Sequence, residues 1–393
     1  MNIKHPPLIA IVAYNRANSL QRLLNSLLNA DYVISNIPLI ISIDKSPDND
    51  DVLKVANDFE WPFGEKIVNY QKANLGLRKH IIQTGKLSQK YGSIIMLEDD
   101  LYVAPGFYDY AIKALNYSKG KNYIGGISLF NYQYNPLTSF NFNVIQDGFD
   151  NYYFQYASSW GQAWTSEQFQ EFTKWLDKSP NIVERVEIPE YVRSWSDKSW
   201  LKYHIAFLVE KNKYFLYPKI ALSTNFNDVG THVGNSSTTH QVPLLSLKNK
   251  NYNFSSLKES KAIYNSFFEN EYLFNFLGYS KKELHIDLTG YNKNYNQKKY
   301  ILSTNIYNFK ILKTFGRSLK PIEDNIINNI EGADIFLYDT GISQKNNFKK
   351  NTVNDIIYSI KHITLPNSRI IFIWAIKTRM LGYYGKIKEL INL

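Results

Sequence analysis

The sequence contains no cysteine, which excludes disulfide bonds and thiolate-bound metals and is compatible with a reducing compartment. Long hydrophobic runs are also missing. The nearest candidate, "IIFIWAI" at residues 370–376, is far shorter than the ~20 apolar residues of a membrane span and has the length of a strand. The apolar run near the amino terminus is too short for a signal peptide. We therefore expect a cytoplasmic protein whose contact with a membrane, if any, is peripheral at the inner face of the cell membrane.

Several common catalytic signatures are absent from the chain. It has no Walker loop, no G-x-G-x-x-G fingerprint, no zinc signature and no serine nucleophile elbow. The formal charge of +10 accompanies lysine and asparagine that are abundant throughout the chain, so it is weak evidence for binding to nucleic acid. We expect no nucleic-acid partner.

The first 130 residues alternate between short apolar runs and helical patterns. "LIAIVA" at residues 8–13, "IPLIISID" at 37–44, "EKIVNYQ" at 65–71 and "SIIMLEDD" at 93–100 are typical of buried strands. A helical stripe of leucines follows the first strand, and other helical segments separate the later ones. Strands and helices that alternate with short connections predict an α/β fold with a mostly parallel, Rossmann-like sheet flanked by helices.

Polar and charged residues follow each of these strands. Arg16 comes after the first strand, Asp44 ends the second, Arg78 follows the third, and Glu98, Asp99 and Asp100 end the fourth. The carboxyl ends of parallel strands share one edge of a sheet, and ligands of open α/β sheets bind there. Three adjacent carboxylates repel one another unless a cation or hydrogen-bond donors compensate, so the pattern favours a metal site over a solvated turn.

The composition suggests three segments. Residues 1–245 are predicted to form the first α/β domain, 246–283 a polar linker or helical segment, and 284–393 a smaller α/β domain. In this last domain, "LHIDLTGY", "KKYILSTN", "ADIFLYDTG" and "SRIIFIWAI" are read as strands and "VNDIIYSIKHI" as a helix.

A series of short motifs over residues 6–240 resembles the β-1,2-N-acetylglucosaminyltransferases of the N-glycan and O-mannose pathways. The motifs are "AYNR", "SID", "LEDDLYVAPGFYDY", "GISLFN", "SSWGQAW", "SWSDKSW" and "FNDVGTHVG", in that order. The acidic motif followed by Val-Ala-Pro-x-Phe is the specific one. The resemblance implies the GT-A fold and an inverting, metal-dependent transfer from a nucleotide sugar. The second α/β segment has no counterpart in that family and is similar to the tails of bacterial surface-polysaccharide transferases.

The resemblance also implies roles for the residues that follow the strands. Asp100 would bind Mn²⁺ or Mg²⁺ against the donor diphosphate, and Glu98 and Asp99 would contact the sugar and ribose of the donor. Asp44 would accept the N3 proton of uracil, and Arg16 would lie beside the uridine diphosphate. Carboxylate side chains suit the binding of such a cation, because hard cations prefer oxygen ligands and a magnesium-like site needs only one or two carboxylates besides phosphate.

Three further residues complete the predicted donor site. Arg78 lies where the family has contacts to the nucleotide, although the local sequence "NLGLRKH" departs from its pattern. Trp195 lies in an aromatic-flanked turn, and His232 lies in a polar, glycine-punctuated segment that is expected to close over the donor. We expect all three to contribute to donor binding.

Asp197 in "SWSDKSW" falls close to the catalytic base of the family, although Ser196 replaces one of the two acids that follow the tryptophan there. An inverting transfer needs one base to deprotonate the acceptor hydroxyl. Partial desolvation by neighbouring tryptophans is expected to raise the pKa of Asp197 toward the working range. Glu190 and Glu187 are the substitutes for this role.

The sequence thus predicts a transferase that moves a GlcNAc-like sugar from a UDP-sugar to a saccharide or lipid-linked saccharide acceptor during the synthesis of a surface glycan. Two alternatives remain. A sugar-phosphate nucleotidyltransferase would need a glycine-rich basic loop after the first strand, whereas "AYNRANS" contains no glycine. A catalytically inactive carbohydrate-binding module would have no need of an intact acidic triplet.

Overall fold

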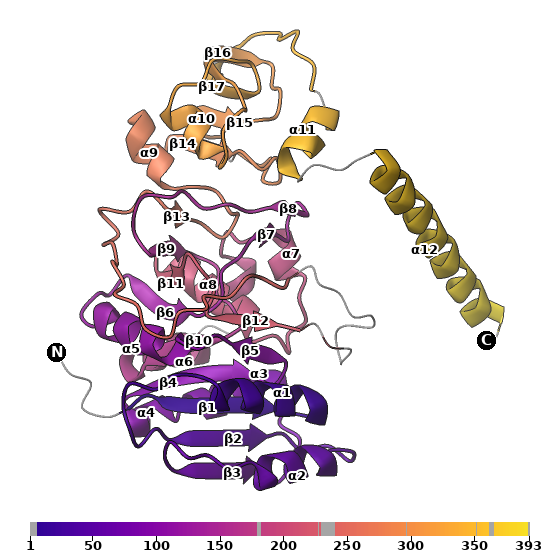
Figure 1. The fold of residues 1–393 in the computed structure, drawn as a ribbon. Coiled ribbons are helices and arrows are strands. Elements are labelled where there is room, and N and C mark those ends of the chain that lie inside the picture. Colours follow the sequence, from indigo (N-terminus) through magenta and orange to yellow (C-terminus); the bar gives the residue numbers. More distant parts are fainter. Residues whose placement is uncertain are drawn as a thin grey trace. The chain divides into compact units, whose positions relative to one another are not determined.

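The computed structural model describes residues 6–178, 182–226, 228, 240–295, 297–350, 352–360 and 365–391 (Figure 1). The described chain forms two compact units, Met1–Asn347 and Phe348–Leu393. The predicted domain boundaries at residues 245 and 283 remain a prediction. Among the described residues, no helix is both long and apolar enough to cross a membrane.

A nine-stranded sheet, in the order β13-β9-β11-β6-β10-β4-β1-β2-β3, forms the centre of the first unit. Five of its neighbouring pairs are parallel, and β10 runs antiparallel to both β4 and β6. The strands are β1 (Leu8–Ala13), β2 (Leu39–Ile43), β3 (Lys66–Tyr70), β4 (Ser93–Glu98), β6 (Ile124–Ser128), β9 (Asn151–Phe154), β10 (Gln162–Thr165), β11 (Tyr214–Pro218) and β13 (Ile263–Tyr264). The predicted α/β class with a mostly parallel sheet is confirmed.

Helices cover both faces of this sheet. They are α1 (Ala17–Leu28), α2 (Asp50–Asp58), α3 (Leu77–Gly85), α4 (Ser88–Tyr91), α5 (Phe107–Ser118), α6 (Ser166–Lys178), η1 (Ile182–Glu184), α7 (Glu190–Arg193) and α8 (Leu201–Glu210). Alternate residues of β1 enter two different cores: Leu8 and Ala10 pack with α6 and α8, and Ile9 and Ile11 pack with α1, α2 and α5. Burial on both faces explains why the predicted strands are continuous apolar runs.

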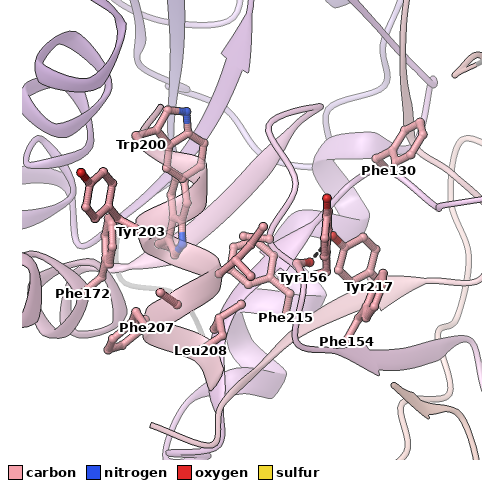
Figure 2. Close-up of a cluster of buried hydrophobic side chains, with 14 of the residues drawn as sticks. Phe130, Phe154, Tyr156, Phe172, Trp200, Tyr203, Phe207, Leu208, Phe215 and Tyr217 are labelled. Carbon is pink, nitrogen blue, oxygen red and sulfur yellow. Dashed lines mark hydrogen bonds between the residues drawn. The ribbon is translucent and has the colours of Figure 1, made fainter. Parts of the chain in front are cut away.

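The core beside α6 and α8 is built largely from aromatic rings (Figure 2). Trp164 contacts Trp200 edge to face, with ring centroids 6.0 Å apart. His204, which is fully buried, lies in the same cluster, with its ring centroid 4.1 Å from that of Phe172. Trp164 and Trp200 are therefore packing residues of this core.

Two short pairs of strands and a second sheet complete the described part of the first unit. The pairs are β5 (Leu101–Val103) with β12 (Ser223–Asn225) and β7 (Tyr134–Asn135) with β8 (Phe140–Asn141). The second sheet, in the order β14-β15-β17-β16, comprises β14 (Leu284–Asp287), β15 (Tyr300–Ser303), β16 (Phe309–Phe315) and β17 (Ile335–Ser343), accompanied by α9 (Tyr272–Leu277) and α10 (Glu323–Ile327). The predicted strands in residues 284–343 are confirmed, and β16 is an additional strand.

The second unit contains α11 (Thr352–Ser359) and α12 (Leu365–Ile391). The helix predicted at "VNDIIYSIKHI" is confirmed for residues 353–359, and residues 361–363 lie outside the described residues. The prediction of a strand at "SRIIFIWAI" is wrong, because residues 368–376 belong to α12. A short apolar run cannot be assigned to a strand or a helix by periodicity alone. Here the run continues into a longer helical segment.

Candidate functional site

The candidate site lies at the carboxyl edge of three adjacent parallel strands. β1 pairs with β2 on one side and with β4 on the other, and Val12 is opposite Glu98. The register brings the residues after all three strands to the same edge. Tyr14, Asp44 and Asp99 are the nearest of these, and the backbone N–H of Tyr14 donates to Asp99 Oδ2 at 3.3 Å.

Arg16 joins β1 to the acids that end β4. Its guanidinium donates to Asp100 Oδ2 at 3.0 Å and to Asp99 Oδ1, and it forms ion pairs with both carboxylates. Arg16 immediately precedes α1, so the fold places its side chain at this edge. The structure therefore brings together Arg16, Asp99 and Asp100 as the sequence predicts.

Burial shifts the protonation of Glu98 and Asp99. It raises the pKa of Glu98 to about 8, with the charges of Asp100 and Asp99 adding to the effect and Arg16 opposing it. Burial also raises the pKa of Asp99 to about 6, although the Arg16 charge acts in the opposite direction. Near neutral pH the site thus favours a protonated Glu98 beside an ionised Asp99.

Asp100 has one oxygen that is available for a ligand. Its Oδ1 atom is buried and has no hydrogen-bond partner among the described residues, whereas Oδ2 accepts from Arg16. No group of three or more His, Asp or Glu side chains within the described ranges is arranged as a metal cluster. A magnesium-like cation that also binds phosphate needs only one or two carboxylates, so the residues present fit the predicted cation.

Asp44 organises the loop between β3 and α3. It is buried, and its Oδ1 atom accepts from the backbone N–H groups of Lys45 at 3.0 Å and Leu75 at 2.8 Å. Its Oδ2 atom accepts from the N–H of Gly76 at 2.9 Å. Gly76 has φ +74°, which favours glycine, and it directly precedes α3. Asp44 therefore positions the backbone on one side of the site.

Asn49 and Asn74 tie together the loops that follow β1, β2 and β3, and neither is among the predicted site residues. The Asn49 side-chain amide donates to the carbonyls of Tyr14 at 3.0 Å and Asp44 at 2.7 Å. That of Asn74 donates to the Lys45 carbonyl at 2.8 Å. Their position after a strand is the only sequence signal that could have identified them.

The start of the predicted closing segment is held near Arg16. The backbone N–H of Phe226 donates to the Asp100 carbonyl at 3.0 Å. Asp228 accepts from the Ser19 hydroxyl at 2.7 Å and forms an ion pair with Arg22, both on α1. His232, predicted to contact the donor, lies outside the described residues.

Arg78, the second residue of α3, lies near Asp197. The Arg78 guanidinium lies over the Tyr203 ring at 5.0 Å, and its charge contributes to lowering the pKa of Asp197. Trp195, half-buried, packs edge to face on Tyr191 with ring centroids 5.6 Å apart.

The expected raised pKa of Asp197 is wrong. Its carboxylate is 85% exposed and accepts from Lys202 Nζ at 2.7 Å, and this hydrogen bond and charge lower its pKa. Trp200, one of the tryptophans expected to desolvate it, is buried in the aromatic core. The substitute Glu190 is also exposed, at 77%, and pairs with Arg193, while Glu187 is exposed. The role of catalytic base remains a prediction.

No family model and no curated protein sequence matches the chain. Some solved structures are similar to part of it. The mannosyltransferase PcManGT from Pyrobaculum calidifontis, in complex with GDP-Man and Mn²⁺, is 14% identical over 44% of this chain and 47% of that chain, with a TM-score of 0.32. Residues 1–349 of S. aureus TarS in complex with UDP are 14% identical over 55% of this chain and 59% of that chain, with a TM-score of 0.34. Each likeness covers less than two thirds of the other protein.

Proposed function

We propose that the protein is a metal-dependent inverting glycosyltransferase that transfers a GlcNAc-like sugar from a UDP donor to a saccharide or lipid-linked saccharide. One observation carries the proposal. The ends of β1, β2 and β4 converge so that Arg16, Asp44 and the acidic triplet share one edge of the sheet. This edge is where open α/β sheets bind their ligands.

Each group has a role in this proposal. Asp44 keeps one lone pair, on Oδ2, beyond the three N–H groups that it already accepts, and this lone pair would accept the N3 proton of uracil. Arg16 supplies positive charge for the diphosphate, and Glu98 and Asp99 would contact the ribose and sugar hydroxyls. Asp100 Oδ1 would hold Mn²⁺ or Mg²⁺, which when bound stabilises the charge that develops on the leaving diphosphate.

Asp197 is the proposed base on the acceptor side. Its lowered pKa keeps it ionised at neutral pH, so it is in the form that can accept a proton. Its ion pair with Lys202 must loosen before the carboxylate can reach an acceptor hydroxyl. The work of the enzyme is the assembly of a surface glycan in the cytoplasm, a compartment with which a chain without cysteine is compatible.

The proposal is tested by measuring UDP release from a panel of UDP-sugars, with saccharide acceptors, with and without Mn²⁺. We expect release to require both cation and acceptor, and Asp100→Asn to abolish it while leaving the free energy of unfolding within about 1 kcal/mol of the parent. Asp58→Asn, an exposed carboxylate on α2, is the matched control and should retain full activity. Full activity in excess chelator, or in Asp100→Asn, would overturn the metal-dependent assignment.

A further inference from the structure

The second compact unit carries most of the excess positive charge of the protein. Residues 348–393 contain eight Lys or Arg and two Asp or Glu, a net of +6 out of +10 for the whole chain. One of the two acids, Asp355, lies 3.7 Å from Lys350 in an ion pair. The unit is therefore strongly cationic over its 46 residues, whereas the other 347 residues carry a net charge of only +4.

The same unit exposes large apolar side chains. On α11, Val353 and Ile357 are 64% and 63% exposed. On α12, every residue from Ile370 to Ile376 is exposed, and Phe372 reaches 66%. Seven consecutive residues make about two helical turns, so the apolar surface covers all sides of this part of α12 rather than one stripe.

A helix that is apolar all round requires an apolar environment on all sides. The run is only about 10 Å long, and none of the described helices is long and apolar enough to cross a membrane. Arg369 precedes the run, and Lys377 and Arg379 follow it; all three are exposed. A short apolar run between cations fits the boundary of a bilayer, where aliphatic and aromatic groups enter the acyl region and the cations remain among the headgroups.

We propose that residues 348–393 bind the surface of an anionic lipid bilayer, with Ile370–Ile376 inserted at the interface and the flanking cations on the lipid phosphates. Charge complementarity selects this partner, because a juxtamembrane Lys or Arg gains roughly 1 kcal/mol at an anionic surface. A second copy of the chain would carry the same net charge of +6 to the contact and would be repelled. This inference is independent of the transferase assignment.

The test is co-sedimentation of the full-length protein with vesicles of phosphatidylcholine alone or with 30% phosphatidylglycerol. We expect binding to the anionic vesicles that weakens as salt rises, and little binding to the neutral ones. The triple variant R369Q/K377Q/R379Q should bind anionic vesicles about 100-fold more weakly. The matched control K119Q/K258Q/K282Q removes the same charge from exposed lysines of the first unit and should bind as the parent does.

A second variant separates the apolar contribution. I370S/F372S keeps every charge and should reduce the binding that persists at 0.5 M salt, while circular dichroism confirms that the chain stays folded. The proposal is overturned if the parent fails to bind anionic vesicles at low salt, or if both charge variants weaken binding equally. It is also overturned if I370S/F372S dissociates a dimer in analytical ultracentrifugation with vesicle binding unchanged, which would identify a second copy as the partner.

Discussion

Replacing Asp44 with asparagine should destabilise the loop between β3 and α3 before any donor is considered. The carboxylate accepts three backbone N–H groups, from Lys45, Leu75 and Gly76, at 2.8–3.0 Å. Asparagine has one acceptor oxygen, so its amide must face at least one of these donors. A hydrogen bond to a charged acceptor contributes about 1.5–3 kcal/mol, so we expect the free energy of unfolding to fall by about 2 kcal/mol.

Alanine at the same position leaves all three N–H groups without this acceptor and should cost more, roughly 4 kcal/mol. Urea denaturation at pH 7 measures both losses, and amide hydrogen exchange reports on the loop itself. The amides of Leu75 and Gly76 should exchange faster in Asp44→Asn than in the parent. The exposed Asp58→Asn change should alter stability by less than about 0.5 kcal/mol. Unchanged exchange at Leu75 and Gly76, together with unchanged stability, would refute the role of Asp44 as the organiser of this loop.

Three further predictions concern other groups. Asp197→Asn should lower turnover at least ~100-fold and leave donor affinity nearly unchanged. Lost donor affinity in binding measurements, together with intact turnover in steady-state kinetics, would instead place Asp197 in the donor site. Burial raises the pKa of Glu323 from 4.5 to about 8, so the neutral form favours folding. Stability should fall as pH rises from about 4.5 to about 8, by on the order of 5 kcal/mol in all, and level off above that. Urea denaturation of Glu323→Gln between pH 6 and 9 should show a smaller fall, and an identical fall would contradict this cause. Neither ring nitrogen of the buried His204 has a hydrogen-bond partner among the described residues, so His204→Leu should raise the free energy of unfolding by about 1 kcal/mol. A clear loss of stability in urea denaturation would contradict this expectation.

The strands that lead to the candidate site could be predicted because each is a buried apolar run followed at once by a polar group. β1, β2 and β4 needed no information beyond this local pattern, and the parallel arrangement follows from the intervening helices. Their shared edge then brings Arg16 to Asp99 and Asp100. The part of the site that depends on strand ends was therefore accessible from the sequence.

Features set by contacts between distant segments could not be predicted in the same way. The antiparallel insertion of β10 between β4 and β6 depends on pairing across residues far apart in sequence. The pKa of Asp197 depends on whether its side chain is covered, and its neighbours in sequence do not cover it. The helical state of Ile370–Ile376 depends on the residues that extend the run.

The most direct test of the central claim is calorimetric titration of UDP and CDP into the folded parent and Asp44→Asn proteins in the presence of Mn²⁺. A carboxylate that accepts the N3 proton of uracil meets an acceptor, not a donor, at the same position of cytosine. We predict that the parent binds UDP at least ~10-fold more tightly than CDP, a difference of about 1.4 kcal/mol, and that Asp44→Asn loses this preference. Equal affinity of the parent for UDP and CDP, or a preference that survives in Asp44→Asn, would contradict a uridine site at the ends of β1, β2 and β4.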